Sequence, residues 1–221
     1  MTSPKLYAIL ISQKTQYKKR GGNMFISDVA LIRTGIVSAR KKSDKSHTNS
    51  FEYRLLNLKC VSANGTLIQA QTEPFWSDEK LNSDFLTQKG DILVRLSAPY
   101  TAILIQRDED CGLLVPSHFA IIRANTEVIL PEYLLWYLKR ESTYQQILQN
   151  ASGSSSFGTI SSGFLGTLSI RNISLPKQKK IGQLLLLSER ENELLLRLAE
   201  EKKKYNQIMI NTIYESVKRG K

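Results

Sequence analysis

The chain has 221 residues, of which 41% are hydrophobic, and this is enough for one domain of about 150 to 180 residues with an appended segment. No stretch approaches the roughly 18 consecutive apolar residues of a membrane span, and the first residues lack the order of a secretory signal. We therefore expect a cytoplasmic protein in which Cys60 and Cys111 are reduced thiols rather than part of a metal site.

The net charge of +11 is unevenly distributed along the chain. Residues 1–59 carry 12 Lys or Arg and 3 Asp or Glu (+9), whereas residues 60–110 carry 4 and 8 (−4). Residues 177–221 are basic again, with 11 and 6 (+5). Two basic regions around a neutral-to-acidic middle predict a polyanionic partner, most often nucleic acid.

The N-terminal part of the chain contains a basic loop. Residues 1–23 are expected to form an arm or a first edge element, and residues 24–32 a short helix or a strand. In the loop that follows, Arg40, Lys41 and Lys42 lie among Gly, Ser and Asp residues. Such a loop can follow a phosphate backbone, and a solvated run of charge is the alternative interpretation.

The middle of the chain predicts a mainly β domain. The Asn64-Gly65 pair is a hairpin signal between strands at residues 53–60 and 66–70. Residues 75–88 are expected to be irregular or to form a short helix. Further apolar runs predict strands at residues 92–96, 102–105, 119–123 and 168–173.

Helical patterns return in the second half. Pro131 is a favoured first helical residue, and apolar steps of three and four residues continue to residue 150. Residues 151–170 contain seven serines and four glycines among apolar residues, and we interpret them as a structured loop. The order of elements predicts an α+β fold. Its expected parts are an arm at 1–23, a domain at 24–174 and a long helix at 175–221.

The last segment has the most regular pattern. After Pro176 it contains no proline, and it has apolar residues at three- and four-residue steps, namely Leu184, Leu187, Leu194, Leu198, Tyr205 and Ile208. A helix of about 40 residues reaches roughly 60 Å, more than a small domain covers, so pairing with a second long helix is predicted. Glu191 and Glu201 interrupt the stripe. The alternatives are packing against a larger partner or back against the same domain.

Motifs for catalysis are missing from the sequence. It has no phosphate-binding glycine loop, dinucleotide-binding glycine pattern, nucleophile elbow or zinc-protease helix. His47 and His118 lie 71 residues apart with no cysteine near either one, and the Asn/Asp-Pro-Pro-Tyr motif of an adenine methyltransferase is absent. We expect a protein that binds rather than reacts, with no metal or cofactor of its own. A self-contained nucleic-acid enzyme is disfavoured.

Several segments together carry a family resemblance. GDILVRLSAP at 90–99, PEYLLWYLKR at 131–140 and the Ser/Gly segment leading into LPKQKKI at 175–181 precede the long helix in that order. This combination resembles the specificity (S) subunit of type I restriction-modification systems over roughly residues 24–219. The last motif is similar to the family's Pro-x-x-x-Gln-x-x-Ile, with a shorter spacing between Pro and Gln. Residues 1–23 are not matched by the family pattern.

The resemblance implies a half-length subunit. A full S subunit carries two target-recognition domains, each reading half of an interrupted DNA site, and two long helices packed antiparallel as a spacer. One domain and one helix imply that two copies form a homodimer that reads an interrupted palindrome, or that the chain pairs with a different half-subunit. The implied partners are double-stranded DNA, an adenine methyltransferase subunit with S-adenosylmethionine, and a restriction subunit driven by ATP.

In this interpretation Arg40, Lys41 and Lys42 contact phosphates. Loop position and donor type suggest further residues near base edges, namely Arg95, Ser97, Tyr100, Ser117, His118, Ser154, Ser155 and Ser156. Two alternatives remain open, in which Arg95 pairs with an acid such as Asp91 and His118 caps a buried strand end. The rival function is a coiled-coil adaptor without sequence-selective DNA binding.

Overall fold

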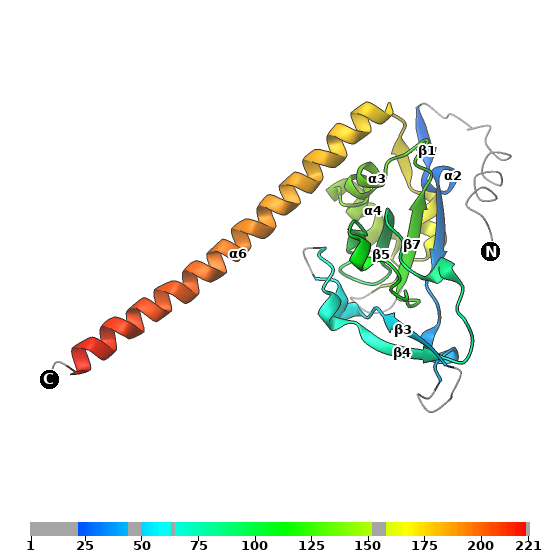
Figure 1. Cartoon of the computed structure of the whole chain (residues 1–221). Helices are drawn as coiled ribbons and strands as arrows, with labels where there is room; N and C mark the ends of the chain where they lie inside the picture. Colours follow the sequence, from blue (N-terminus) through cyan, green and yellow to red (C-terminus); the bar gives the residue numbers. More distant parts are fainter. Residues whose placement is uncertain (1–21, 44–49, 63–64, 152–157, 220–221) are drawn as a thin grey trace. The chain divides into compact units, whose positions relative to one another are not determined.

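The computed structural model describes residues 22–43, 50–62, 65–151 and 158–219. The chain divides into two units, Met1–Gly182 and Gln183–Lys221. The first unit contains all the described strands and helices α2 to α5, and the second contains most of helix α6 (Figure 1). A mainly β domain followed by one long helix confirms the predicted α+β class.

The first unit is built on a four-stranded antiparallel sheet. In spatial order its strands are β2 (Ala30–Thr34), β7 (Phe119–Ala124), β5 (Asp91–Arg95) and β6 (Ala102–Leu104). Thr34 lies opposite Ala120, and Arg95 lies opposite Phe119. Because neighbouring strands run in opposite directions, β2 and β5 finish where β6 and β7 begin. We call this end of the sheet the loop end.

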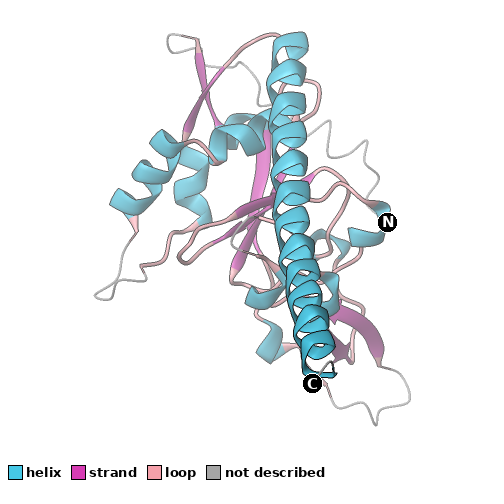
Figure 2. Ribbon diagram, turned by 90° about the vertical axis from the view of Figure 1, so that its left-hand side faces the viewer, coloured by secondary structure: helices cyan, strands magenta, loops and turns pink. Residues whose placement is uncertain are grey.

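The two faces of the sheet are buried by different elements, as expected when apolar residues alternate along strands. Leu93, Ile103 and Ile121 share a core cluster with residues of the irregular segments, such as Leu56 and Val115. Helices cover the other face, with α3 (Pro131–Leu138) against β5, β6 and β7 and α5 (Ser162–Thr167) against β2. Figure 2 shows helices beside the strands of the domain. The sheet is therefore held between a helical layer and a layer of loops and short strands.

Two smaller sheets complete the described β structure. In each, two strands pair antiparallel: β3 (Phe51–Leu55) with β4 (Glu73–Ser77), and β1 (Asn23–Phe25) with β8 (Ser169–Arg171). The first pair covers a satellite core that contains Phe75, Leu81 and Leu114. The second pair ties the start of the described chain to the strand that precedes α6. The predicted strands at 92–96, 102–105, 119–123 and 168–173 are thus present with slightly shifted bounds.

The predicted hairpin around Asn64-Gly65 was wrong in its strands. Residues 66–70 form one bridge, Val61 to Leu67, before the short helix η3 (Gln69–Gln71). Local hydrogen bonds end β3 instead, because the Asn57 side chain accepts from the backbone N–H of Lys59 at 2.8 Å and caps η2 (Leu58–Cys60). The partner of β3 is β4, which occupies part of the segment expected to be irregular.

The helix expected from Pro131 to residue 150 is two helices. After α3, Arg140 has extended backbone angles (φ −66°, ψ 141°), and α4 (Glu141–Asn150) starts in a new direction. The Arg140 guanidinium lies 5.1 Å from the centre of the Trp136 ring, and this stacking holds the break in place. The segment at 24–32 contains both structures that were considered, since α2 (Ile26–Val29) lies between β1 and β2.

Several short helical segments connect the strands. In the predicted Ser/Gly loop, α5 begins where the Ser161 hydroxyl accepts from the backbone N–H of Phe164 at 3.0 Å. The remaining single-turn helices are η1 (Ser38–Arg40), η4 (Ser83–Phe85) and η5 (Asp108–Asp110).

Helix α6 (Leu175–Arg219) begins at the residue expected for the long helix, and its first two turns belong to the first unit. Gln178 is 1% exposed. Its Oε1 accepts from Leu130 N at 2.8 Å, and its Nε2 donates to Val128 O at 3.0 Å and Ile173 O at 2.8 Å. A Cβ on Gly182 would lie 2.5 Å from Glu132 Cβ, so only glycine fits there. These contacts bind the start of the helix to the domain.

Candidate nucleic-acid interface

Main-chain hydrogen bonds align four chain segments at the loop end of the sheet. Ile160 N donates to Leu96 O at 2.9 Å, and Leu96 N donates to His118 O at 2.9 Å. Ser117 N donates to Ile36 O at 2.8 Å, which adds the segment after β2. We call these four segments, 36–37, 96–97, 117–118 and 159–160, the loop row. It places polar residues from distant parts of the sequence next to one another.

A close backbone approach at Gly35 makes the row possible. Ile36 forms a parallel bridge with Pro116, and Ile36 N donates to Val115 O at 2.9 Å. A Cβ on Gly35 would lie 2.3 Å from Pro116 O, which no side chain can tolerate. Only glycine therefore fits at position 35.

Most of the predicted base-edge candidates that are described lie on this row or beside it. His118 is exposed, and Ser97 and Ser117 are partly exposed. Arg95 ends β5, and its Nε donates to Ser97 Oγ at 3.3 Å. Ser154, Ser155 and Ser156 lie outside the described residues. The row therefore brings together polar groups that are 20 or more residues apart in the chain.

Asp91 forms its ion pair with Arg123 and not with Arg95, the alternative partner suggested by the sequence. Its carboxylate accepts from Arg123 Nε at 2.7 Å and Nη2 at 2.8 Å, in a bidentate pair with Asp91 only 1% exposed. Arg33 Nη1 lies 2.6 Å from Asp84 Oδ2, which in turn lies 3.8 Å (Oδ1) from Arg123 Nη1. These four charged side chains join β2, β5, β7 and η4, so they have a structural role. The sequence contains no signal for this network, since its members are widely separated.

Tyr100 differs from the other candidates because it is buried. Its side chain is 6% exposed, and its hydroxyl donates to Gly158 O at 2.6 Å. Its ring packs edge-on against Tyr144, with ring centres 6.4 Å apart. A tyrosine held in this way packs beneath the surface of the loops and does not present its side chain to a ligand. The prediction that Tyr100 lies near base edges was therefore wrong. Thr159, which the sequence interpretation missed, lies on the row opposite Ser97.

The basic loop leaves the row through η1. Arg40, Lys41 and Lys42 are all exposed, and Lys41 forms an ion pair with Glu79. Ser43 N donates to Trp76 O at 2.9 Å and fixes the end of this loop on β4. The three cations thus lie on a segment anchored at both ends, one anchor being the row itself.

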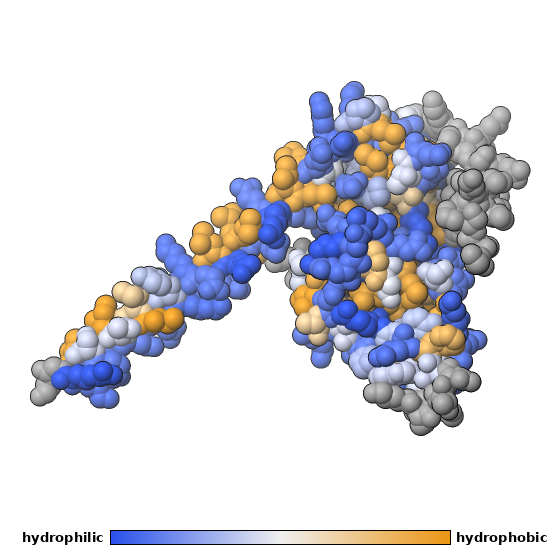
Figure 3. Space-filling model, in the orientation of Figure 1, coloured by the Kyte–Doolittle hydropathy of each residue, from blue (hydrophilic) through white to orange (hydrophobic). Residues whose placement is uncertain are grey.

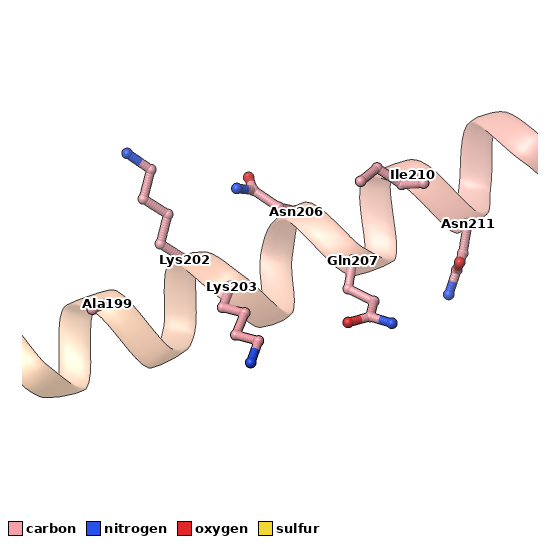
Figure 4. A pocket seen from close by; sticks show the side chains of 7 residues that line it. All are labelled: Ala199, Lys202, Lys203, Asn206, Gln207, Ile210 and Asn211. Carbon is pink, nitrogen blue, oxygen red and sulfur yellow. The ribbon is translucent and has the colours of Figure 1, made fainter.

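The apolar stripe of α6 is exposed along its length in the second unit. We call the six predicted residues, Leu184, Leu187, Leu194, Leu198, Tyr205 and Ile208, the α6 seam, and all six are exposed. Leu184, for example, is 70% exposed. Figure 3 shows hydrophobic side chains following this helix, and Figure 4 shows Lys202, Lys203, Asn206, Gln207 and Ile210 projecting from its middle. A continuous row of exposed apolar side chains is typical of an interaction site.

Charge is divided between the two halves of this helix. Residues 183–201 contain two Arg and five Glu (−3), and residues 202–221 contain six Lys or Arg and one Glu (+5). Some of these charges pair locally, with Arg190 Nη1 2.7 Å from Glu193 Oε2 and Lys204 Nζ 2.8 Å from Glu201 Oε1. The segregation remains, because these pairs are internal to each half or lie at its border.

In the described part of the chain, no group of three or more His, Cys, Asp or Glu side chains is arranged to hold a metal ion. No described helix has the length and apolarity needed to cross a membrane.

Solved structures provide the comparison with known proteins, since no protein-family model and no curated protein matches the chain. The HsdS subunit from Thermoanaerobacter tengcongensis aligns with a TM-score of 0.56 and 18% identity, over 89% of this chain and 50% of that one. This chain has the fold of a type I S subunit. The S subunit from M. genitalium aligns with a TM-score of 0.54 and 17% identity, over 82% of this chain and 42% of that one.

A third match comes from a structure that concerns complex assembly and conformational transition of the type I R-M system. It aligns with a TM-score of 0.61 and 16% identity, over 90% of this chain and 50% of the other. The chain therefore spans about half the length of the structures that it matches. Its described residues form one mainly β domain and one long helix.

Proposed function

We propose that this chain is the DNA-recognition subunit of a type I restriction-modification complex, that it reads one half of an interrupted site, and that it has no catalytic role. The main support is the S-subunit fold over nearly the whole chain. The loop row adds an independent reason, because it gathers polar side chains at one end of a rigid sheet.

The basic loop and the row have different tasks in this proposal. Arg40, Lys41 and Lys42 bind phosphates, which supplies salt-dependent and sequence-independent affinity. Ser97, Ser117 and His118 face base edges, where hydroxyl and imidazole groups can donate or accept hydrogen bonds. Arg95 lies next to Ser97, and its guanidinium can donate two hydrogen bonds to the O6 and N7 atoms of guanine. Ser154 to Ser156 stay in the candidate set as a prediction from the sequence.

Two copies of the chain pair through the α6 seam in this proposal. The seam is too long and too exposed to be covered by one small domain, and a second copy offers a helix of the same length. Antiparallel pairing places the acidic half of each helix against the basic half of its partner, whereas parallel pairing places like charges together. Charge complementarity therefore favours a two-fold, antiparallel dimer that reads an interrupted palindrome.

The methyltransferase subunit is the second proposed partner of this helix. Ile210, Tyr214 and Val217 are exposed and follow one another at steps of four and three residues. Ile210 comes two residues after Ile208, so these three residues lie on a different face from the seam. Pairing of two copies leaves this face free for another subunit. The methyltransferase subunit brings S-adenosylmethionine, and a restriction subunit, where present, brings ATP.

The first experiment combines light scattering with DNA binding. We expect a dimer of about 50 kDa from chains of 25.1 kDa, and selective binding to a site recovered from a random duplex pool. A dimer without selective binding would favour the coiled-coil adaptor. A stable monomer that binds selectively would replace the homodimer by pairing with a different chain.

The phosphate assignment is tested with a double variant, Lys41→Ala with Lys42→Ala. The dependence of the logarithm of affinity on the logarithm of salt concentration should become shallower by about 0.9 from the loss of Lys42, and by up to about 1.8 where DNA displaces Glu79 from Lys41, since each lost phosphate contact contributes about 0.9. Lys202→Ala with Lys203→Ala removes the same charge from α6 and serves as the matched control. An unchanged salt slope in the first variant would exclude these lysines as phosphate contacts.

Helix polarity is tested by disulfide trapping in a Cys111→Ser background, which leaves buried Cys60. Antiparallel pairing predicts that Leu187→Cys forms little disulfide with itself and cross-links to Thr212→Cys in a mixed sample. Parallel pairing predicts the reverse. Strong self-cross-linking at position 187 would therefore rule out the antiparallel dimer.

A further inference from the structure

Tyr100 has an unusual backbone for a bulky residue. Its φ angle is +51°, in the left-handed region that residues with large side chains rarely adopt. Its backbone N–H donates to Ser97 O at 3.0 Å and closes the turn that follows β5. Non-glycine residues keep such angles only where the surroundings hold them, and they occur often at functional sites. The contacts of the side chain show what holds this one.

The Tyr100 hydroxyl contacts the chain at Gly158, directly before the 159–160 segment of the loop row. It donates to Gly158 O at 2.6 Å, while the ring lies edge-on to Tyr144 of α4. Burial raises the pKa of the Tyr100 hydroxyl. A tyrosine hydroxyl is protonated near neutral pH even without this shift, so it can donate the hydrogen bond. The residue therefore joins the turn after β5 to α4 and to the chain that enters the row.

Gly158 is fixed from two sides. A Cβ at this position would lie 2.9 Å from Ala151 Cβ, so the chain that leaves α4 and the chain that enters the row pass in direct contact. The next residue, Thr159, bridges to Ser97, and Ile160 N donates to Leu96 O. The bridge between Ser97 and Thr159, which includes the hydrogen bond from Ile160 N to Leu96 O, holds this segment on the row, and the Tyr100 hydroxyl provides a further attachment at Gly158.

We propose that Tyr100 is a positioning residue for base recognition, which holds Gly158 so that Thr159 and Ser97 keep a fixed spacing on the DNA-facing row. This inference rests on the proposed function. Recognition of adjacent bases requires side chains placed to within a fraction of an ångström, because hydrogen bonds weaken steeply with poor geometry. Phosphate contacts through the basic loop do not depend on this spacing. Loss of the hydroxyl should therefore reduce selectivity and leave nonspecific affinity in place.

The test compares Tyr100→Phe with Tyr133→Phe. Both substitutions remove a buried hydroxyl that donates to a backbone carbonyl, since Tyr133 Oη donates to Arg171 O at 2.9 Å. Tyr133 lies on α3 and its partner on β8, so the control changes the same chemistry away from the row. Phenylalanine keeps the ring and permits the same backbone angles.

Two measurements are made on the full-length chain. Amide hydrogen exchange at Ile160 should be about tenfold faster in Tyr100→Phe than in wild type, the effect of one lost hydrogen bond, and unchanged in Tyr133→Phe. Affinity for a selected duplex should fall about tenfold in Tyr100→Phe, while affinity for random duplex and its salt slope stay the same. Tyr133→Phe should retain the wild-type ratio of selected to random affinity.

Four results would overturn the inference. Unchanged exchange at Ile160 would mean that the hydroxyl does not hold the segment. An equal loss of affinity for selected and random duplex, or the same loss of selectivity in both variants, would leave Tyr100 a purely structural role. Wild-type protein that fails to discriminate between duplexes would overturn the proposed function itself, and this is seen before any variant is compared.

Discussion

Gly35 lies where the chain leaves β2 and passes the backbone at Pro116. We predict that Gly35→Ala lowers the free energy of unfolding by about 2 kcal/mol, because the added methyl group overlaps Pro116 O and forces the backbone apart. Urea denaturation measures the change.

Gly163→Ala is the matched control for this substitution. Its added Cβ would lie 3.7 Å from its nearest neighbour, Ser161 Oγ, and the position is inside α5. Alanine is the better helix former, so this variant should be unchanged or more stable by up to about 1 kcal/mol. Equal destabilisation of the two variants would contradict the steric explanation at Gly35.

Glu79 neutralises one of the proposed phosphate-binding cations by pairing with Lys41. We predict that Glu79→Gln raises affinity for random duplex a few-fold and steepens the salt slope by up to about 0.9, because Lys41 is released. Filter binding across a salt series measures both quantities.

Asp108→Asn tests whether this effect is local. It releases Lys89 from an ion pair of 3.0 Å, and Lys89 lies next to the start of β5, at the opposite end of the sheet from the loop row. The same charge change there should leave the salt slope unchanged. If both variants steepened the slope equally, overall charge rather than Lys41 would be responsible.

Among the elements, α6 depends on a buried amide for its attachment to the domain. We predict that Gln178→Leu lowers the free energy of unfolding of the first unit by about 3 kcal/mol, because Leu130 N, Val128 O and Ile173 O lose their partner. Gln183→Leu makes the same substitution at an exposed position on the same helix and should change stability by less than about 0.5 kcal/mol. An equal loss in both variants would show that the buried hydrogen bonds of Gln178 are not its cause.

Elements with a strong local pattern were predictable from the sequence. The apolar run at Ile92 to Leu96 and the three- and four-residue steps after Leu184 correspond to β5 and α6. Elements decided by local polar bonds were not predictable. Asn57 ends β3, and Arg140 separates α3 from α4, through contacts that depend on geometry rather than on periodicity.

The candidate site was predictable in its residue types and not in its assembly. Loop position singled out Ser97, Ser117 and His118, which the structure places together on one row. Burial of Tyr100 and the place of Thr159 depend on long-range contacts with Gly158 and Ser97, and a single sequence carries no record of such pairings. Polar residues in predicted loops therefore indicate candidate binding residues, and the topology of the fold determines which of them lie close together.

For the whole molecule, the buried thiol and phenol groups predict that the free energy of unfolding falls at alkaline pH. Burial raises the pKa of Cys60, Tyr133 and Tyr137, so the folded chain keeps protons that the unfolded chain releases. Their stabilising contribution is complete below the unfolded pKa values, about 8.5 for Cys and 10 for Tyr, and is lost as pH rises through the raised values. Each group lowers the free energy of unfolding by at most about 1.4 kcal/mol per pH unit in that range.

Urea denaturation between pH 7 and 11 measures this decline. Cys60→Ser should flatten the first part of the curve, above about pH 8.5, while Tyr137→Phe should flatten the later part. Cys111→Ser makes the same change at a partly exposed position and serves as the control. A decline that starts below pH 8 and survives both substitutions would need another titrating group.

The loop row is joined by backbone groups, and this has a consequence for how such a protein can change. Hydrogen bonds between main-chain atoms at Leu96, His118, Ser117 and Ile36 do not depend on the side chains carried there. A library randomised at Ser97, Ser117, His118 and Thr159 should therefore yield mostly folded members, whose preferred duplexes differ. New target preferences would then arise by drift on an unchanged scaffold, one substitution at a time.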